Sequence, residues 1–269
     1  HGDESTTADP PQPLHQRHRT RLRHAPFAAA LTGTVIVITP LVAVTLRSLR
    51  HDGTWTLTGF RALFDGTLDS VGIDIGACIA TSARFALATV AIAVSLALLA
   101  TRRDRTTVTE QLTLAPLLIS AVTLGFGIIV TFDVSPINWR SSTFMIPVVH
   151  SVIALPLAVR IIGPARRAID PVLHESAADL GASRFATWRT VELPLLRPAL
   201  ARAAGISAAV SLGEFGATSF LTRSGSMTVP IAIAQLMGRP GPLLQLTGFA
   251  LVAVIVAGFA VSLIVNPSR

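Results

Sequence analysis

The chain has 269 residues, of which 51% are apolar and 14% are charged, and it contains no tyrosine and no lysine. This balance is too apolar for an ordinary soluble domain and predicts a polytopic membrane protein. The formal charge of +7 comes entirely from arginine, and without a lysine the chain cannot supply a Walker A loop, which excludes a P-loop ATPase in this chain. Its single cysteine, Cys78, excludes an internal disulfide and a cysteine-based zinc site.

The first part of the chain differs sharply from the rest. Residues 1–26 are polar, contain prolines and are rich in arginine, and they lack the apolar core of a secretory signal peptide. We therefore expect residues 1–26 to form a disordered cytoplasmic tail or linker. Residues 27–269 are expected to form the transmembrane domain.

Apolar stretches of about 20 residues, the length that crosses a bilayer as a helix, recur six times after this tail. They cover residues 27–46, 79–100, 112–132, 143–162, 201–221 and 243–265. The expected fold is an all-α polytopic membrane protein with about six transmembrane helices.

The arginines are unevenly distributed among the connecting segments. They concentrate in the N-terminal tail, after the second span and between the fourth and fifth spans, whereas the other connections mix fewer arginines with aspartates. By the positive-inside rule, both termini and the connection between spans four and five are predicted to be cytoplasmic. Because the positive charge is split among several loops, a nucleic-acid partner is not expected.

The longest connection on the opposite side, residues 47–74, contains Trp55, Phe60 and Phe64 together with four aspartates. It is expected to carry a short helix at the membrane interface. Its aromatic residues either anchor the membrane boundary or contact the substrate.

Three of the ionisable residues inside the predicted spans are candidates for a specific role. Arg84 lies in the first part of the second span, from which it can snorkel to the headgroups. Glu214, in the fifth span, is expected to line a pathway or a helix interface, with direct substrate handling as the alternative; Gly213 and Gly216 beside it allow close helix approach. His150 in the fourth span is either a hydrogen-bonded packing residue or a ligand for a metal substrate.

The sequence contains no Ser/His/Asp arrangement, paired-carboxylate pattern or metal-ligand spacing. It therefore predicts no catalytic residue, no metal site and no cofactor bound by this chain.

The connection between spans four and five is predicted to form two short helices. Asp170 can cap the first helix and Pro171 suits its first turn. Gly181 can end this helix in the left-handed conformation. The second helix is expected to begin after Ser183 and to stop before Pro194. One face of it is apolar and carries Phe185, Trp188 and Val191.

The same connection carries a family motif. Its residues are Glu175, Ser176, Ala177, then Gly181 after three residues, Val191 after nine more, and Leu193 and Pro194 after one more. This pattern resembles the EAA loop of the transmembrane subunits of bacterial ABC importers, with Ser176 in place of alanine and Val191 in place of isoleucine. Residues 124–127, 150–156, 211–221 and 228–231 also resemble segments of the branch that includes iron(III), thiamine, sulfate and molybdate permeases.

The resemblance implies an import pathway in the bacterial cytoplasmic membrane. Its partners would be a second permease half or copy, two cytoplasmic ATPase subunits that bind the ATP, an extracytoplasmic solute-binding protein and membrane lipid. The implied coupling residues are Glu175, Ser176, Ala177, Ala178, Gly181, Leu193 and Pro194. Arg184 and Arg189 are expected to meet acidic groups of the ATPase or of lipid.

Iron(III) and thiamine rank first as expected cargo, because the chain looks like the C-terminal half of the permeases in which two halves are fused. From a different class, the alternative is a secondary transporter or channel driven by an ion gradient, with Glu214 and Arg84 as a charged relay.

Overall fold

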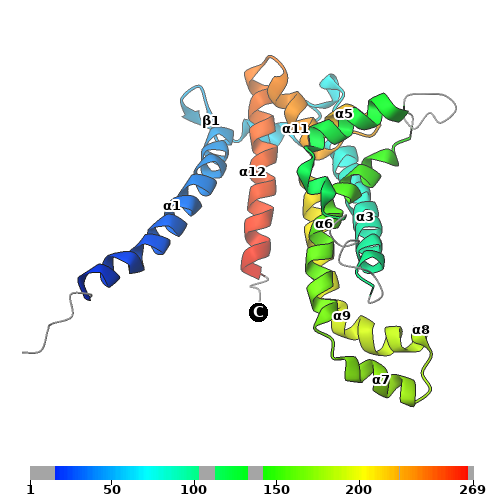
Figure 1. Cartoon of the computed structure of the whole chain (residues 1–269). Helices are drawn as coiled ribbons and strands as arrows, with labels where there is room; N and C mark the ends of the chain where they lie inside the picture. Colours follow the sequence, from blue (N-terminus) through cyan, green and yellow to red (C-terminus); the bar gives the residue numbers. More distant parts are fainter. Residues whose placement is uncertain (1–15, 103–112, 133–141, 224, 266–269) are drawn as a thin grey trace, which may run out of the picture.

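The computed structural model describes residues 16–102, 113–132, 142–223 and 225–265 of the chain (Figure 1). In chain order, its elements are α1 (Gln16–Ser48), β1 (Arg50–His51), β2 (Thr54–Trp55), α2 (Thr58–Ala62), the short 3-10 turn η1 (Asp69–Val71), α3 (Ile75–Ala100), a second 3-10 turn η2 (Ala115–Leu118), α5 (Ala121–Phe132), α6 (Met145–Arg167), α7 (Pro171–Asp179), α8 (Arg184–Thr187), the π-helical turn η4 (Trp188–Glu192), α9 (Leu193–Gly213), α10 (Thr218–Leu221), α11 (Val229–Gly238) and α12 (Pro242–Val265).

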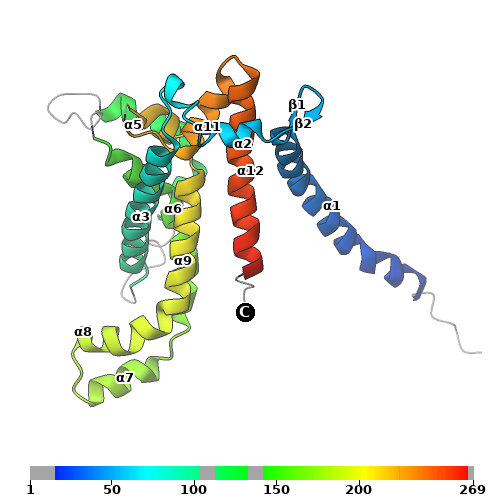
Figure 2. The same cartoon turned by 180° about the vertical axis from the view of Figure 1, so that it is seen from behind.

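Helices α3, α6 and α9 pack against one another and form the core of the molecule (Figure 1, Figure 2). Small side chains recur on their facing sides at steps of three or four residues, the spacing that keeps them on one helix face. Such rows let helix backbones approach closely, as in helix association within membranes. The buried small residues in these rows include Ser82, Ala86, Thr89, Ala93 and Ala97 on α3, Ser151, Ala154 and Ala158 on α6, and Ala199, Ala203, Ser207 and Ser211 on α9.

Helices α1 and α12 lie outside this core. α12 contacts α1, α2 and α11, and α1 extends away from the rest of the molecule (Figure 1). The guanidinium of Arg47, near the end of α1, lies 5.7 Å from the ring centre of Phe249 on α12. Large apolar side chains along α1, such as Phe27 and Ile36, are exposed, as expected of a helix that faces lipid or another subunit.

The predicted fold class is confirmed: the described chain is α-helical apart from one two-residue hairpin, and several helices are long and apolar. Four helices among the described residues are long and apolar enough to cross a membrane: Pro26–Ser48, Ile75–Ala100, Met145–Arg167 and Arg184–Gly213. They lie over the first, second, fourth and fifth predicted spans. α12 lies over the sixth.

The third predicted span, residues 112–132, is not one helix in the described part of the chain. Residue 112 lies outside the described residues, η2 with Pro116 at its start occupies 115–118, and Ile119 is extended before α5 begins. The 12 residues of α5 extend about 18 Å, which is shorter than the hydrocarbon layer of about 30 Å. Hydropathy therefore identified an apolar segment correctly, but the α-helix within it is shorter than the predicted span.

The bounds predicted for the fifth span, residues 201–221, differ at both ends from those of the observed helix α9, Leu193–Gly213. α9 ends at Gly213, Glu214 is extended, and the chain becomes helical again only at Thr218. The cause of this break is the Glu214 side chain, which accepts hydrogen bonds from the start of α10 and so replaces the continuing helix.

The predicted disordered tail is helical in part. α1 begins at Gln16, so residues 16–26 belong to this helix, whereas residues 1–15 lie outside the described residues. Arginine is a good helix former, so an arginine-rich segment directly before an apolar helix can extend that helix backwards.

The connection between α1 and α3 contains the expected short helix, α2, and a hairpin that the sequence analysis did not foresee. Arg50 pairs with Trp55 across the hairpin. Its turn residues Asp52 and Gly53 have φ values of 48° and 80°, as in the mirror-image turns favoured by an Asp-Gly pair.

One glycine of α5 sits where no side chain fits. A Cβ atom at Gly125 would lie 2.6 Å from the Cα of Ala217 and 2.9 Å from its carbonyl oxygen. We expect Gly125→Ala to reduce the free energy of unfolding by about 1–3 kcal/mol, the usual cost of overpacking. The matched control is Gly127→Ala, because a Cβ at Gly127 would meet nothing within 4 Å. Thermal unfolding in detergent measures both; equal melting temperatures would contradict the close packing of α5 on the segment before α10.

Candidate functional site

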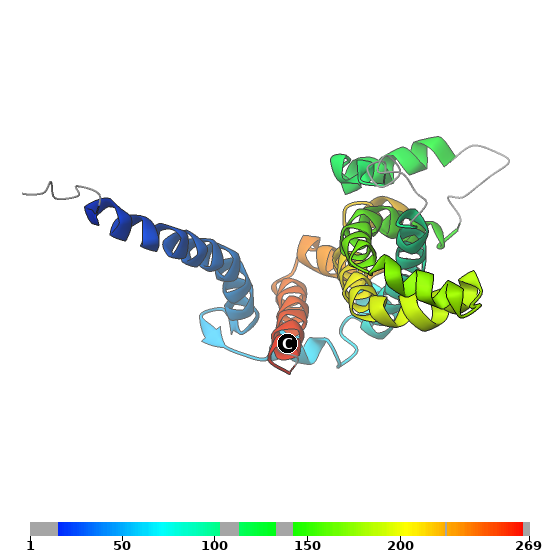
Figure 3. The ribbon, with the colours of Figure 1, turned by 60° about the horizontal axis from the view of Figure 1, so that its bottom comes forward.

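The connection between α6 and α9 folds into a hairpin of two short helices at one end of the core (Figure 1, Figure 3). We call residues 170–192 the α7–α8 hairpin. The carboxylate of Asp170 accepts a hydrogen bond from the N–H of Val172 at 2.9 Å, and Pro171 is the first residue of α7. The predicted start of this helix is confirmed.

Gly181 forms the corner between the two helices. Its φ is +76°, in the left-handed region. Its N–H donates to the carbonyl of Ala178 at 2.8 Å, and the N–H of Ala182 donates to that of Ala177 at 3.0 Å. This pair of bonds is the Schellman ending of a helix. Ser183 then caps α8 by accepting from the N–H of Ala186 at 3.2 Å, so the predicted helix, glycine corner and second helix are confirmed.

The second helix does not stop before Pro194, as the sequence analysis expected. Through the wide turn η4, the N–H of Leu193 donates to the carbonyl of Trp188, five residues earlier, and the chain continues directly into α9. A π-helical turn changes the hydrogen-bond register, so the helix passes Pro194, which has no N–H to donate, at the first turn of α9. The second arm of the α7–α8 hairpin is thus one continuous helix with a long apolar span.

The residues of the predicted motif lie mostly on the surface. Glu175, Ser176, Ala178, Gly181 and Pro194 are exposed, and Ala177 and Leu193 are half-buried. Large apolar residues beside them are exposed as well, with Leu180 at 88% and Val172 at 57%. An exposed apolar patch of this kind on one projecting hairpin is typical of a docking surface.

A partly buried ion-pair cluster fixes the base of the α7–α8 hairpin. Glu192 lies between two partners: its Oε2 is 3.3 Å from Nη2 of Arg166, and its Oε1 is 3.0 Å from Nε2 of His174. Arg166 is only 7% exposed, and its Nη1 donates to the carbonyl of Leu98, near the end of α3, at 2.8 Å. The cluster therefore ties α7 and the start of α9 to the ends of α6 and α3. The sequence analysis missed it.

The exchange Glu192→Gln is expected to loosen the α7–α8 hairpin. It removes the charge that holds both Arg166 and His174, and a hydrogen bond to a charged group contributes about 1.5–3 kcal/mol. Local opening should then increase on the order of tenfold, measured as the rate of tryptic cleavage at the exposed Arg184 and Arg189. Glu175→Gln is the matched control, since Glu175 is exposed on the same hairpin and makes no ion pair among the described residues. Equal cleavage rates in the two variants would contradict the role of Glu192.

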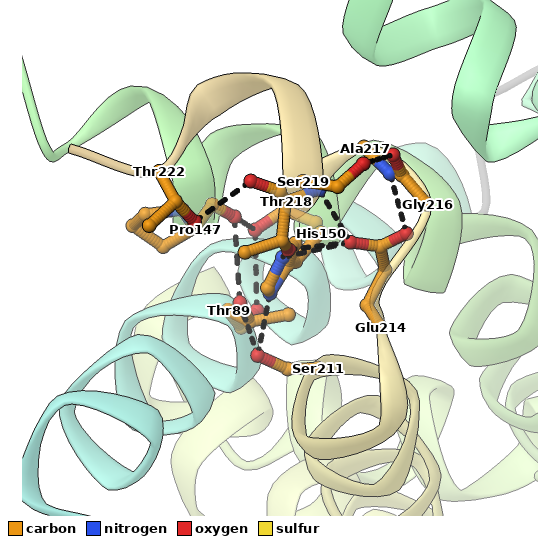
Figure 4. Close-up of polar contacts among 11 residues, drawn as sticks. Thr89, Pro147, His150, Ser211, Glu214, Gly216, Ala217, Thr218, Ser219 and Thr222 are labelled. Carbon is orange, nitrogen blue, oxygen red and sulfur yellow. Dashed lines mark hydrogen bonds and ion pairs between the residues drawn. The ribbon is translucent and has the colours of Figure 1, made fainter. Parts of the chain in front are cut away.

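A second polar cluster is buried inside the helix core (Figure 4). The carboxylate of Glu214 turns toward the start of α10. Its Oε1 accepts from the N–H of Ala217 at 2.8 Å, and its Oε2 accepts from the N–H and the hydroxyl of Thr218, the N–H at 2.9 Å. Glu214 thus caps α10 and satisfies backbone groups that water could not reach.

His150, buried on α6, completes this cluster. Its Nε2 lies 2.8 Å from the hydroxyl of Thr218 and 3.4 Å from Oε2 of Glu214, and its Nδ1 lies 2.8 Å from the hydroxyl of Ser211. Since the Thr218 hydroxyl gives its one proton to the carboxylate, its oxygen must accept from His150, which places a proton on Nε2. Thr89 on α3 donates to Ser211 at 3.3 Å, so the cluster joins α3, α6, α9 and α10.

This geometry bears on the two alternatives for His150. Both of its ring nitrogens have hydroxyl partners within the bundle, and no group of three His, Cys, Asp or Glu side chains that could hold a metal occurs among the described residues. The packing and hydrogen-bonding interpretation is therefore favoured over metal ligation.

The two glycines beside Glu214 differ. A Cβ at Gly216 would lie 3.1 Å from Cγ2 of Val122 on α5, whereas one at Gly213 would meet nothing within 4 Å. Close approach is thus a property of Gly216 and not of Gly213. Arg84 is exposed on α3, and among the described residues the ion-pair partner of Glu214 is His150 and not Arg84.

A core of apolar helices carries a two-helix hairpin that is continuous with one of the long spans, which is the architecture of a polytopic membrane protein with a projecting hairpin. The chain belongs to the family described as binding-protein-dependent transport system inner membrane component, whose model matches residues 91–267. This match includes the α7–α8 hairpin and the His150–Glu214 cluster.

Three relatives illustrate this family. The "Putative 2-aminoethylphosphonate transport system permease protein PhnV" of Salmonella typhimurium is 32% identical over 124 residues, 46% of this chain and 47% of the relative. The "Molybdenum transport system permease protein ModB" of Escherichia coli is 34% identical over 119 residues, 43% and 48% of the two chains. The "Probable ABC transporter permease protein y4fN" of Sinorhizobium fredii is 33% identical over 125 residues, 45% of this chain and 22% of the relative. The chain spans about half the length of the first two relatives.

Proposed function

We propose that the chain is one permease half of a bacterial ABC importer, which forms part of the translocation pathway for a small solute. The observation that carries this proposal is the α7–α8 hairpin, which has the EAA spacing and a left-handed corner at Gly181. Its continuity with α9 supports a coupling role. A push on this hairpin would shift a whole span as a rigid body, one of the ordinary routes to a two-state gate.

The coupling partner in this proposal is a cytoplasmic ATPase subunit, which binds the ATP. Family membership supports it, together with the exposed apolar residues of the hairpin and the motif residues on its surface. The concentration of arginine near the hairpin supports a cytoplasmic location for it and for both termini.

The remaining partners follow from the same proposal. A second permease half or copy would cover exposed apolar helices such as α1, whose most apolar 18-residue stretch contains no buried residue. An extracytoplasmic solute-binding protein would dock at the end of the bundle opposite the α7–α8 hairpin. The membrane would be the bacterial cytoplasmic membrane.

The cargo is the finer part of the proposal. Iron(III) and thiamine were expected from the resemblance, but the reported relatives carry the names of aminoethylphosphonate and molybdenum transport systems. We therefore add 2-aminoethylphosphonate to the candidates and place molybdate, which the resemblance already included, beside iron(III) and thiamine. Thermal-shift measurements of the associated solute-binding protein with thiamine, iron(III), molybdate and 2-aminoethylphosphonate would choose among them.

Uptake into proteoliposomes tests the function. With the second permease half, the ATPase and the loaded solute-binding protein, we expect solute uptake only when ATP is present on the ATPase side. Liposomes without the ATPase should take up no solute. Uptake driven by an ion gradient without the ATPase would contradict the proposal and support a secondary transporter.

A further inference from the structure

A pocket of about 670 Å³ lies between the last two turns of α3 and the second arm of the α7–α8 hairpin. One wall is apolar and comes from Leu98 and Leu99 of α3. The other is aromatic and comes from Phe185 and Trp188, whose rings stack with their centres 5.9 Å apart. The remaining lining residues are Ser95, Arg102, Arg166, Arg184 and Glu192.

The charged side chains that line this pocket carry a net positive charge. Its three arginines face one carboxylate, Glu192, which already pairs with Arg166. Arg102 and Arg184 are exposed and have no ion-pair partner among the described residues. In addition, the Nε of the buried Arg166 has no hydrogen-bond partner in the described part of the chain. An unpaired buried donor beside two uncompensated cations indicates an anionic ligand.

The position of the pocket indicates whether its anionic ligand is a free anion or the headgroup of a lipid. It lies where α3 ends and the arginines begin, the level at which an apolar span meets the membrane surface. Aromatic side chains are enriched at this level, and arginine binds lipid phosphates there. An apolar wall, an aromatic wall and a cationic rim together match an amphiphile with a negative headgroup better than a free anion.

We propose that this pocket binds an anionic phospholipid, with its phosphate at Arg102 and Arg184 and the first part of an acyl chain along Leu98, Leu99 and the Phe185–Trp188 stack. The walls belong to two different elements, so the bound lipid would hold the α7–α8 hairpin against the end of α3. This binding site goes beyond the proposed transport function and does not depend on the identity of the cargo.

A photoactivatable lipid tests the site in the assembled transporter. The probe is phosphatidylglycerol with a photoreactive group near the start of one acyl chain, used at low mole fraction in phosphatidylcholine nanodiscs. We expect labelling of residues 98–102 and 185–188, mapped by peptide mass spectrometry, and competition by unlabelled phosphatidylglycerol. Arg102→Gln and Arg184→Gln should each reduce labelling about fivefold, the effect of one basic residue at an anionic lipid surface. The control Arg197→Gln, an exposed arginine in the first part of α9 outside the pocket, should leave labelling unchanged.

Several results would overturn this assignment. Equal labelling by the phosphatidylcholine analogue, insensitive to the arginine exchanges, would show ordinary contact with bulk lipid. Loss of labelling on addition of inorganic phosphate would show a site for a soluble anion. Labelling of the isolated chain that disappears on assembly would show that another subunit covers this face. The melting temperature of each variant confirms that the exposed exchanges leave the fold intact. Because labelling is also measured on the isolated chain, it does not require transport activity.

Discussion

Replacing Gly181 with valine is expected to abolish solute uptake and solute-stimulated ATP hydrolysis while the spans stay folded. The φ of +76° at this corner is costly for a residue with a Cβ, by about 1–2 kcal/mol, and most costly for a β-branched one. A Cβ at Gly181 would meet nothing within 4 Å, so the effect comes from the backbone and not from a collision. Without the left-handed corner, α7 and α8 cannot keep their mutual orientation, and the docking surface is lost.

Gly181→Asn is the matched control. Asparagine enters the left-handed region more readily than other residues with a side chain, so this variant should keep most of the coupled activity. Uptake and ATP hydrolysis are measured in the reconstituted transporter, with the amount of membrane-inserted chain measured in the same sample. If the valine variant transported as well as the asparagine variant, the corner would not be needed for coupling.

The largest effect on stability is expected from Glu214→Ala. This exchange leaves two N–H groups and the hydroxyl of Thr218 without their acceptor, and it removes the carboxylate beside the buried His150. Leaving one buried donor without its acceptor costs about 1–3 kcal/mol, and three donors lose theirs here. Thermal unfolding of the purified chain should therefore show a large loss of stability, together with a loss of uptake.

A double-mutant cycle separates this cluster from simple cavity formation. We expect Glu214→Gln and His150→Gln to be non-additive, with a coupling energy of about 0.5–3 kcal/mol, because the two side chains share Thr218. As a control, Glu214→Gln combined with Glu175→Gln should be additive, since Glu175 lies on the surface of the distant hairpin. Additivity in the first pair would contradict a single hydrogen-bonded network.

Local features were predicted best from the sequence. The cap at Asp170, the corner at Gly181 and the cap at Ser183 each depend on one side chain or one backbone conformation and its near neighbours. Long apolar stretches likewise identified four spans and the position of α12, because a membrane helix is recognisable from length and hydropathy alone. The expectation that the hairpin couples to an ATPase came from the resemblance to the EAA motif and not from helix prediction.

The errors have a common physical origin in contacts that hydropathy does not report. Hydropathy averaged along the sequence cannot show that Glu214 ends α9 by capping α10. It also cannot show that the π-helical turn η4 lets the helix continue past Pro194. The link from Glu192 to Arg166 joins residues far apart in the sequence, and only the packed structure brings them together. The difference between Gly213 and Gly216 also depends on which neighbour faces each residue.

The proposed coupling role requires the α7–α8 hairpin to dock against an ATPase subunit. Cys78 is buried and is the only cysteine, so Ala178→Cys places a single reactive thiol on the exposed motif surface. Ser70→Cys places a thiol in the exposed segment just before α3, near the N-terminal end of that helix, whereas the α7–α8 hairpin lies near its C-terminal end. With a short thiol-directed crosslinker in the assembled transporter, we expect Ala178→Cys to capture the ATPase, with a yield that changes on ATP binding, and Ser70→Cys to capture none. Equal yields at the two positions, or no capture at Ala178→Cys in a transporter that still takes up solute, would contradict the coupling role.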